Sequence, residues 1–205
     1  MQISHNELII HPASLNEIPD VANFISAGYY HDKFFIWSVP DDVRRHKIVA
    51  DYYEIYLRAA GAVSHVAETA DGKVVGATVW LPHDVDAGMY DDIDRVAGEF
   101  APRFRAVSDK SHDNEPKGIP FYQLVGFVTA KEVQGQGVGT AMLRHNLSKF
   151  DMQGIPTYLE ASTPYHGGGV YGRFGYQHFG ELMVFAEGAI LYPLWRPADI
   201  ANQNI

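Results

Sequence analysis

The sequence predicts a single α/β or α+β domain built on a mixed sheet, part antiparallel and part parallel. Three observations predict it: early segments with helical spacing of apolar residues, a clear β-hairpin over 65–81, and a strand, turn, helix and strand in succession over 121–162. The chain has 205 residues, 46% of them hydrophobic, which is enough for one sizeable core. We therefore expect residues 1–205 to form one domain.

The first third of the chain is expected to be mainly helical after one short strand at Leu8–Ile10. Ser14 precedes Glu17 by three residues, which is the spacing of a capping box at a helix start. Apolar residues then recur at helical spacing at Ile18, Val21, Ala22 and Ile25. Pro40-Asp41-Asp42 opens a second helical segment, in which Val43, Val49, Tyr52, Tyr53, Tyr56 and Leu57 could share much of one face.

The middle of the chain begins with the hairpin, in which segments 65–69 and 73–81 flank Ala70-Asp71-Gly72. Asp-Gly supplies the positive φ angles of a tight two-residue turn, so the two strands should be antiparallel. Residues 82–118 show no clear pattern; 91–107 has helical character but is crossed by Pro102. The shape of this segment stays open.

Strands and helices alternate in the rest of the chain. In order, we expect a strand at 121–129, a helix through Phe150 stopped by Gly154 and Pro156, a strand at 157–162, a short helix at 170–174 closed by Gly175, and two last strands at 181–186 and 189–195.

Charge and composition exclude several classes of protein. The net charge of −9, from 16 basic and 25 acidic residues, argues against binding to nucleic acid or to anionic membrane surfaces. The absence of cysteine excludes disulfides, thiolate metal sites and a cysteine nucleophile. The start "MQISHNELII" lacks signal-peptide features, and no apolar run reaches the ~18 residues that span a bilayer, so we expect a cytoplasmic protein.

The segment "EVQGQGVGTAML", residues 132–143, places glycines at 135, 137 and 139 directly before the predicted helix. Without β-carbons, main-chain N–H groups could approach a ligand, and the positive end of the helix dipole favours an anion such as a diphosphate. Gln134 and Thr140 could add side-chain donors. The helix behind has a predicted buried face made of Val138, Met142, Leu143, Leu147 and Phe150.

Ordinary loop geometry is the alternative explanation of these glycines. Two known phosphate-binding loops are excluded by the residues themselves. A dinucleotide-binding fingerprint requires glycine where Thr140 stands, and the triphosphate-binding loop requires a lysine that the segment lacks.

The run Gln134-Gly135-Gln136-Gly137-Val138-Gly139 resembles the Gln/Arg-x-x-Gly-x-Gly/Ala signature of the GNAT superfamily, the acyl-CoA-dependent N-acetyltransferases. "YLEAS" (158–162) and "VYGRFGY" (170–176) resemble, in order and approximate distance, the next strand of that superfamily and its Leu-Tyr-x-Arg-x-Gly-Phe segment. "ATVWLP" and "PLWRP" are similar to members of the puromycin-acetyltransferase-like branch.

The resemblance implies a strongly twisted mixed sheet flanked by helices, whose fourth and fifth strands splay apart to admit the pantetheine arm of acetyl-CoA. "LVGFVT" would be the fourth strand and "YLEAS" the fifth. The implied acetyl-CoA-binding residues are Phe127, Val128 and Thr129 by their backbone, the loop Gln134, Gly135, Gln136, Gly137, Val138, Gly139 and Thr140, and Ser162.

The sequence departs from the family pattern at two places. Thr129 replaces the apolar β-branched residue that usually stands five places before the glutamine. The segment 165–169 is one residue longer than usual and is rich in glycine, which leaves the contacts of 167–169 with coenzyme A open.

Acetyl transfer from a thioester to an amine requires a neutral amine, oxyanion stabilisation and a proton for the departing thiolate. The resemblance assigns the proton donor to Tyr171, whose reference pKa of about 10 suits a thiol of about 8.5. Glu160, on the opposite strand face from Leu159 and Ala161, is the first candidate for the base. The alternative for Tyr171 is a packed aromatic ring, and the alternative for Glu160 is a solvated or salt-bridged strand residue. Weaker candidates for the base are Glu68, His65 and His83.

The acceptor pocket is expected to involve the early helices and residues 82–118. An aromatic cluster there, either pocket or core, comprises Tyr29, Tyr30, His31, Phe34, Phe35 and Trp37. His31-Asp32 and His112-Asp113 lack the spacing of metal ligands, so we expect no metal.

The leading hypothesis is acetyl transfer from acetyl-CoA to an amine of a small molecule, by direct attack in a ternary complex. A non-catalytic acyl-CoA-binding sensor or partner module is the alternative. The oligomeric state stays open, a homodimer included.

Overall fold

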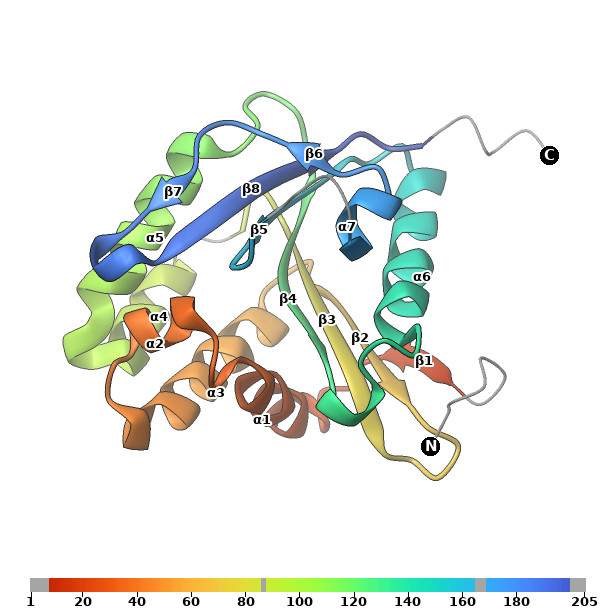
Figure 1. Cartoon of the computed structure of the whole chain (residues 1–205), viewed down its shortest axis with the longest axis horizontal. Coiled ribbons are helices and arrows are strands. Elements are labelled where there is room, and N and C mark those ends of the chain that lie inside the picture. The colour runs from red at the N-terminus through yellow and green to blue at the C-terminus, as the bar shows by residue number, and fades with distance from the viewer. Residues whose placement is uncertain (1–7, 86–87, 165–168, 200–205) are drawn as a thin grey trace.

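A computed structural model describes residues 8–85, 88–164 and 169–199 and shows a sheet covered by helices on both faces (Figure 1). The strands are β1 Ile9–Pro12, β2 Val63–Glu68, β3 Val74–Pro82, β4 Tyr122–Thr129, β5 Thr157–Ala161, β6 Gln177–His178, β7 Met183–Val184 and β8 Ile190–Arg196. The helices are α1 Ile18–Tyr29, α2 Lys33–Ser38, α3 Asp42–Arg58, α4 Gly88–Ala97, α5 Ala101–Asn114, α6 Val138–Met152 and α7 Gly169–Arg173. Short 3₁₀ turns are η2 Gly98–Phe100, η3 Lys131–Val133 and η4 Ala186–Gly188.

The strands are ordered β1-β2-β3-β4-β5-β8-β6, with β7 beside β8. Neighbouring strands are antiparallel except β4 and β5, which are parallel. This parallel pairing covers only residues 122–124 against 157–159, so among the described residues no strand pairs with residues 125–129 of β4 on that side. The predicted mixed sheet with diverging fourth and fifth strands is therefore confirmed.

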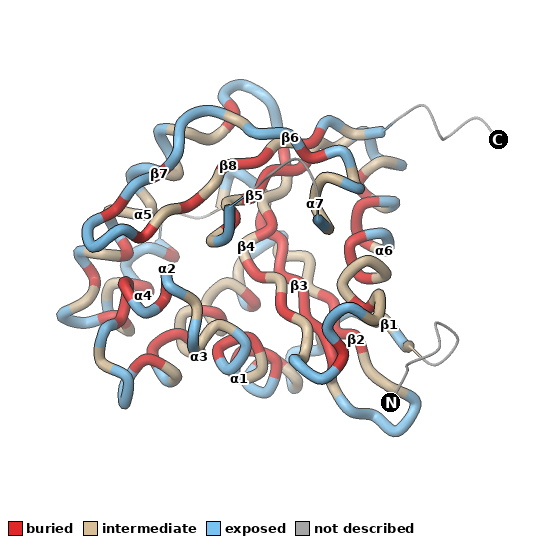
Figure 2. Tube along the Cα trace, viewed as in Figure 1, coloured by how far each residue is buried: buried red, intermediate tan, exposed pale blue. Residues whose placement is uncertain are grey.

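The core is divided between the two faces of the sheet. In β2, Val66 packs with α1 and α3, whereas its neighbour Ala67 packs with α6 on the other face, as the alternation of a strand requires. Buried residues concentrate along β3, β4 and the inward sides of the helices (Figure 2). The predicted inner face of α6 is buried at each of its five positions, Val138, Met142, Leu143, Leu147 and Phe150.

The starts of the early helices differ partly from expectation. Helix α1 begins at Ile18 rather than after Ser14, because Pro19 occupies its first turn and Glu17 accepts the Ser14 N–H (2.7 Å) in the turn before it. Helix α3 begins as predicted, with Asp41 as its N-cap. Of the apolar residues expected to share a face of α3, Val49, Tyr53 and Leu57 are buried, whereas Val43 is 86% exposed.

The hairpin is confirmed, but its turn has three residues rather than two. The Thr69 N–H donates to the Lys73 carbonyl (3.0 Å), and of the turn residues only Gly72 has a positive φ, of +79°. The segment left open by the sequence forms α4 and α5. Pro102 lies in the first turn of α5, where its missing N–H removes no helical hydrogen bond.

The end of the chain is only partly as expected. The strand predicted at 181–186 is reduced to the two residues of β7, and β6 was not predicted. Among the helices described, none is both long enough and apolar enough to cross a bilayer.

Arg196, at the end of β8, ties the C-terminal strand to the rest of the fold. Its Nη1 and Nη2 atoms each lie 2.7 Å from one oxygen of Asp151 in α6. Its Nε donates to the carbonyl of Phe174 (2.7 Å), just after α7. The same side chain therefore holds α6, β8 and the segment after Tyr171 in place.

Candidate active site

A cavity of about 700 Å³ lies where β4 and β5 diverge and is closed on the other side by residues of α1 to α5. Its lining brings together predicted site residues from three separate parts of the chain: Phe127, Val128, Thr129, Gln134, Glu160, Ser162 and Tyr171. The remaining loop residues, Gly135, Gln136, Gly137, Val138, Gly139 and Thr140, are not among the lining residues; the loop follows the end of β4.

Backbone conformation or packing also favours a glycine at each of these positions in the loop. Gly135 and Gly137 have φ angles of +77° and +89°, a backbone conformation that side chains disfavour. A β-carbon at Gly139 would lie 2.9 Å from the ring of Phe127. Gln134 donates from Nε2 to the carbonyl of Thr129 (3.3 Å), so the loop is fixed to the end of β4.

Helix α6 starts from Gly137 without a side-chain cap. The amide groups of its first turn, Val138, Gly139 and Thr140, have no carbonyl partner within the helix by its geometry. The helix is anchored through Val138, which is buried against Val75 and Met142. A rigid helix start with unpaired donors is a favourable place for an anion.

The free side of β4 is paired with tyrosine hydroxyls instead of a strand. Tyr29 of α1 accepts the Phe127 N–H (2.9 Å) and donates to the Phe127 carbonyl (3.1 Å). Tyr53 of α3 donates to the Val125 carbonyl (3.0 Å). Burial raises the pKa of Tyr29 to about 12, which keeps its hydroxyl protonated. The sequence identified the aromatic cluster but contained no signal that Tyr29 would hold this backbone pair.

Tyr171, on α7, packs its ring 6.1 Å from that of Phe127 and 5.8 Å from that of Tyr176. Burial raises the pKa of its hydroxyl well above the ordinary value, so the group is protonated at neutral pH. Within the described residues nothing hydrogen-bonds this hydroxyl. Its position beside Phe127 places a protonated donor next to the diverging half of β4.

Glu160 lies on the cavity wall and is held by two hydroxyl groups. Its carboxylate accepts from Ser111 Oγ (2.8 Å) and from Tyr158 Oη (3.0 Å). Burial raises the pKa of Glu160 to about 7, although both hydrogen bonds act in the opposite direction. A carboxyl group with this pKa can exchange a proton near neutral pH.

The three weaker candidates for the base are separated by the fold. His83 lines the cavity. His65 lies against α6, with Nε2 3.1 Å from Lys149 Nζ, and burial together with the Lys149 charge lowers its pKa to about 4. Neither His65 nor Glu68 is among the residues that line the cavity.

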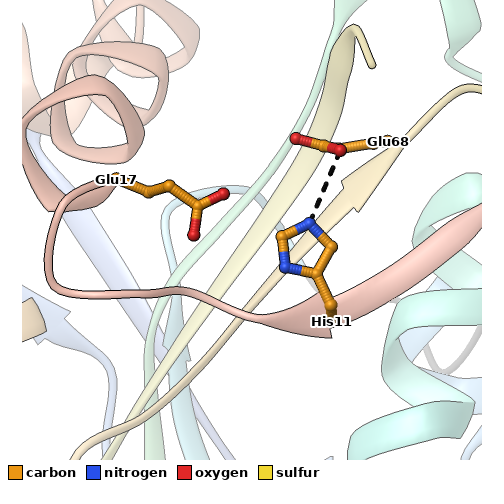
Figure 3. Close-up of side chains that lie close together, drawn as sticks. All are labelled: His11, Glu17 and Glu68. Carbon is orange, nitrogen blue, oxygen red and sulfur yellow. Dashed lines mark ion pairs between the residues drawn. The ribbon is translucent and has the colours of Figure 1, made fainter. Parts of the chain in front are cut away.

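Glu68 belongs to a separate group with His11 and Glu17, in which one ligand atom from each residue lies within 4.8 Å of the others (Figure 3). His11 Nε2 is 3.6 Å from the Glu68 carboxylate, and Glu17 holds the amide of Ser14. No pattern in the sequence indicated this group. An ion pair and a helix-start turn account for its geometry, and none of the three residues lines the cavity.

The helical side of the cavity is aromatic and acidic. Its rings belong to Tyr29, Phe34, Phe35, Tyr52, Tyr53, Tyr56, Tyr90 and Phe104. Its carboxylates belong to Asp32, Asp94, Asp109 and Glu115, and Glu160 of β5 adds another from the strand wall. Arg105 is the only lysine or arginine in this lining as described, and its Nε lies 2.7 Å from Asp94. The wall therefore favours a cationic ligand.

The aromatic cluster predicted over residues 29–37 is divided between pocket and core. Tyr29, Phe34 and Phe35 line the cavity. Trp37 instead packs against Phe185, with ring centres 4.8 Å apart. Of the glycine-rich segment left open by the sequence, residues 167 and 168 lie outside the described residues, and Gly169 begins α7.

The sequence matches no protein-family model and no curated protein. The structure, however, is similar to solved acetyltransferases. A Corynebacterium glutamicum protein described as histone acetyltransferase HPA2 and related acetyltransferase is 21% identical with a TM-score of 0.68, over 94% of this chain and 97% of that chain. Arylalkylamine N-acetyltransferase 2 from Aedes aegypti is 12% identical with a TM-score of 0.62, over 94% and 99%.

The ribosomal-protein-S18-alanine N-acetyltransferase from Escherichia coli is 15% identical with a TM-score of 0.56, over 97% of this chain and 98% of that chain. At such identities the similarity shows a shared fold. The mixed sheet with one parallel, diverging strand pair is the GNAT fold.

Proposed function

We propose that the protein transfers the acetyl group of acetyl-CoA to an amine of a small molecule. The observation that carries this proposal is the end of the β4–β5 pairing at Leu124 and Leu159, which leaves a cavity between the strands with Tyr171 and Glu160 on its wall. The shared fold supports acetyl transfer, and a cavity of about 700 Å³ suits a small acceptor. The segments "ATVWLP" and "PLWRP" support placement in the puromycin-acetyltransferase-like branch.

The residues present fit acetyl-CoA as a substrate. Its diphosphate would bind the amides of the first turn of α6, since that turn has no side-chain cap. Its thioester arm would enter beside Phe127, whose N–H and carbonyl are held by the Tyr29 hydroxyl rather than by a strand. A side-chain hydroxyl can move away more easily than a strand, so this backbone pair is available for exchange.

The chemistry that we propose uses two side chains. Glu160 takes a proton from the acceptor ammonium, and the resulting nitrogen lone pair attacks the thioester carbonyl carbon. The carbon–sulfur bond then breaks as Tyr171 donates its proton to the departing sulfur, and the nitrogen passes its surplus proton to the Tyr171 oxygen as the neutral amide forms. Glu160 releases its proton to solvent, so both side chains return to their starting states. Both groups have the required protonation: Tyr171 is neutral, and Glu160 is ionised in a large fraction of molecules at neutral pH.

Activity should depend on pH through Glu160. Because the pKa of Glu160 is about 7, the base is protonated below that value, and kcat/KM should rise with pH through about 7 and then level off. Glu160→Gln should remove this rise and lower kcat/KM by about 10²-fold or more. Initial rates from pH 5.5 to 9 for both proteins check this. A wild-type rise that persists in Glu160→Gln would assign the titration to another group.

The proposed function is tested by incubating the protein with acetyl-CoA and a panel of primary amines while free thiol and acetylated product are measured. We expect thiol release that requires both the protein and an amine. Tight binding of acetyl-CoA without thiol release for any amine would instead support the non-catalytic acyl-CoA-binding module.

A further inference from the structure

We propose that Asp32 is the residue that anchors the ammonium group of the acceptor in this cavity. The inference rests on the proposed function and adds to it a substrate class: amines whose remaining part is uncharged and apolar or aromatic. In the sequence, Asp32 stands out only as a neighbour of His31, a pair without metal-ligand spacing, and no local pattern signals this role.

Asp32 is held rigidly on the cavity wall. It is the N-cap of α2, where one carboxylate oxygen accepts the Phe34 N–H (2.8 Å). The other oxygen accepts from Ser162 Oγ (2.6 Å), just beyond the end of β5. Asp32 and Ser162 both line the cavity, so the hydrogen bond joins its helical wall to its strand wall.

The charge of Asp32 is not neutralised by the protein as described. No described lysine, arginine or histidine forms an ion pair with it, and Arg105 of the same cavity is paired with Asp94. A carboxylate without a counter-ion, next to aromatic side chains, attracts a cation more strongly than a solvated one does.

The location of Asp32 relative to the reacting groups also fits an anchor. Glu160 lies near the end of β5 and Ser162 just beyond it, and both line the cavity, so the hydrogen bond between Asp32 and Ser162 places Asp32 at the end of the strand that carries the base. The Asp32 charge also contributes, after burial, to the raised pKa of Tyr29, so Asp32 lies near the hydroxyl that holds Phe127. An ammonium at Asp32 would therefore lie in the same cavity as Glu160 and near the Tyr29 hydroxyl that holds the diverging half of β4.

The surrounding charges restrict the acceptor further. An acceptor with its own carboxylate, such as an amino acid, would place that group against the acidic wall of Asp94, Asp109 and Glu115. The rings of Tyr52, Tyr56 and Phe104 instead favour an apolar body. Phenethylamine should therefore be accepted in preference to phenylalanine.

The test compares Asp32→Asn with the matched variant Asp41→Asn. Both residues are helix N-caps, and asparagine caps as well as aspartate, so both variants should fold. Asp41 does not line the cavity. At saturating acetyl-CoA, Asp32→Asn should raise the KM for phenethylamine about tenfold or more with kcat within about twofold, whereas Asp41→Asn should leave both within about twofold of wild type.

Two further measurements separate charge recognition from a structural defect. Phenethyl alcohol, an uncharged analogue, should inhibit wild type and Asp32→Asn equally, because only the charged contact is removed. Calorimetry should show that phenethylamine binds Asp32→Asn about tenfold more weakly than wild type, a result that does not depend on turnover.

The failures of the two proposals are distinguishable. If wild type acetylates phenethylamine and Asp32→Asn has an unchanged KM, the anchor is wrong and the proposed function stands. If wild type releases no thiol with any amine, the proposed function fails, and the calorimetric comparison still decides whether Asp32 binds ammonium. Equal affinity of wild type and Asp32→Asn for phenethylamine, or no affinity in either, would overturn the inference.

Discussion

Replacing Tyr171 with phenylalanine should lower kcat by about 10²- to 10⁴-fold while leaving the affinity for acetyl-CoA nearly unchanged. The change removes only the hydroxyl, so the ring keeps its packing against Phe127 and Tyr176. Without a proton donor, the sulfur must leave as an unprotonated thiolate, which raises the barrier of the transfer step. Steady-state rates with a thiol-detecting reagent, together with calorimetric titration of acetyl-CoA, measure the two effects separately.

Tyr122→Phe is the matched control for this prediction. Tyr122 also loses a hydroxyl, one that donates to the Gly61 carbonyl (3.3 Å), but it does not line the cavity. Its kcat should stay within about twofold of wild type, because the lost hydroxyl lies outside the cavity and the loss of an exposed hydroxyl has little effect on stability. An unchanged kcat in Tyr171→Phe would show that Tyr171 is a packed aromatic residue and not the proton donor.

Asp151→Ala should reduce the free energy of unfolding by about 3–5 kcal/mol. The loss is large because the side chain of its partner, Arg196, is only 7% exposed and would remain charged without a carboxylate. Without Asp151, the Arg196 side chain can also move away from the Phe174 carbonyl, so the positions of α7 and Tyr171 should change as well. Urea unfolding followed by tryptophan fluorescence measures the difference.

The control here is Asp51→Ala, which breaks the pair between Asp51 and Lys47 on α3. The Lys47 side chain is 78% exposed, so the loss should be about 1 kcal/mol or less. Losses of similar size in the two variants would show that burial does not increase the contribution of the Asp151–Arg196 pair to the free energy of unfolding.

The sequence predicted the sheet and its main helices well because local signals and the global fold agree there. The hairpin of β2 and β3 and the buried stripe of α6 each need only neighbouring residues. Prediction failed where a second local feature opposed the signal. Ser14 and Glu17 have capping-box spacing, yet Pro19 moves the helix start to Ile18. Residues 82–118 gave no pattern because two helices meet there at a turn with Pro102 in the second.

The candidate site was predictable only where a motif marked it. Tyr171 and Glu160 were named from the sequence, and the fold brings both to one cavity. Tyr29 was named only as a member of the aromatic cluster, and its bond to Phe127 was missed, as was Asp32, because the partners are remote: Tyr29 bonds a residue 98 positions away, and Asp32 one 130 positions away. Hydrogen bonds of this kind leave no local pattern in the chain.

The central claim is that the loop before α6 binds the diphosphate of coenzyme A, and calorimetric titration of coenzyme A tests it most directly. The informative variants are Gly135→Asn and Gly118→Asn. Both glycines have positive φ, +77° and +72°, with open space around an added β-carbon, and asparagine tolerates this conformation. The two substitutions should therefore cause similar backbone strain, and they differ in that only Gly135 belongs to the loop before α6.

We predict one-site binding of coenzyme A to wild type and to Gly118→Asn, and binding weakened about tenfold or more, ~1.4 kcal/mol, in Gly135→Asn because its side chain enters the space of the diphosphate. No binding to wild type, or equal binding to all three proteins, would contradict the account.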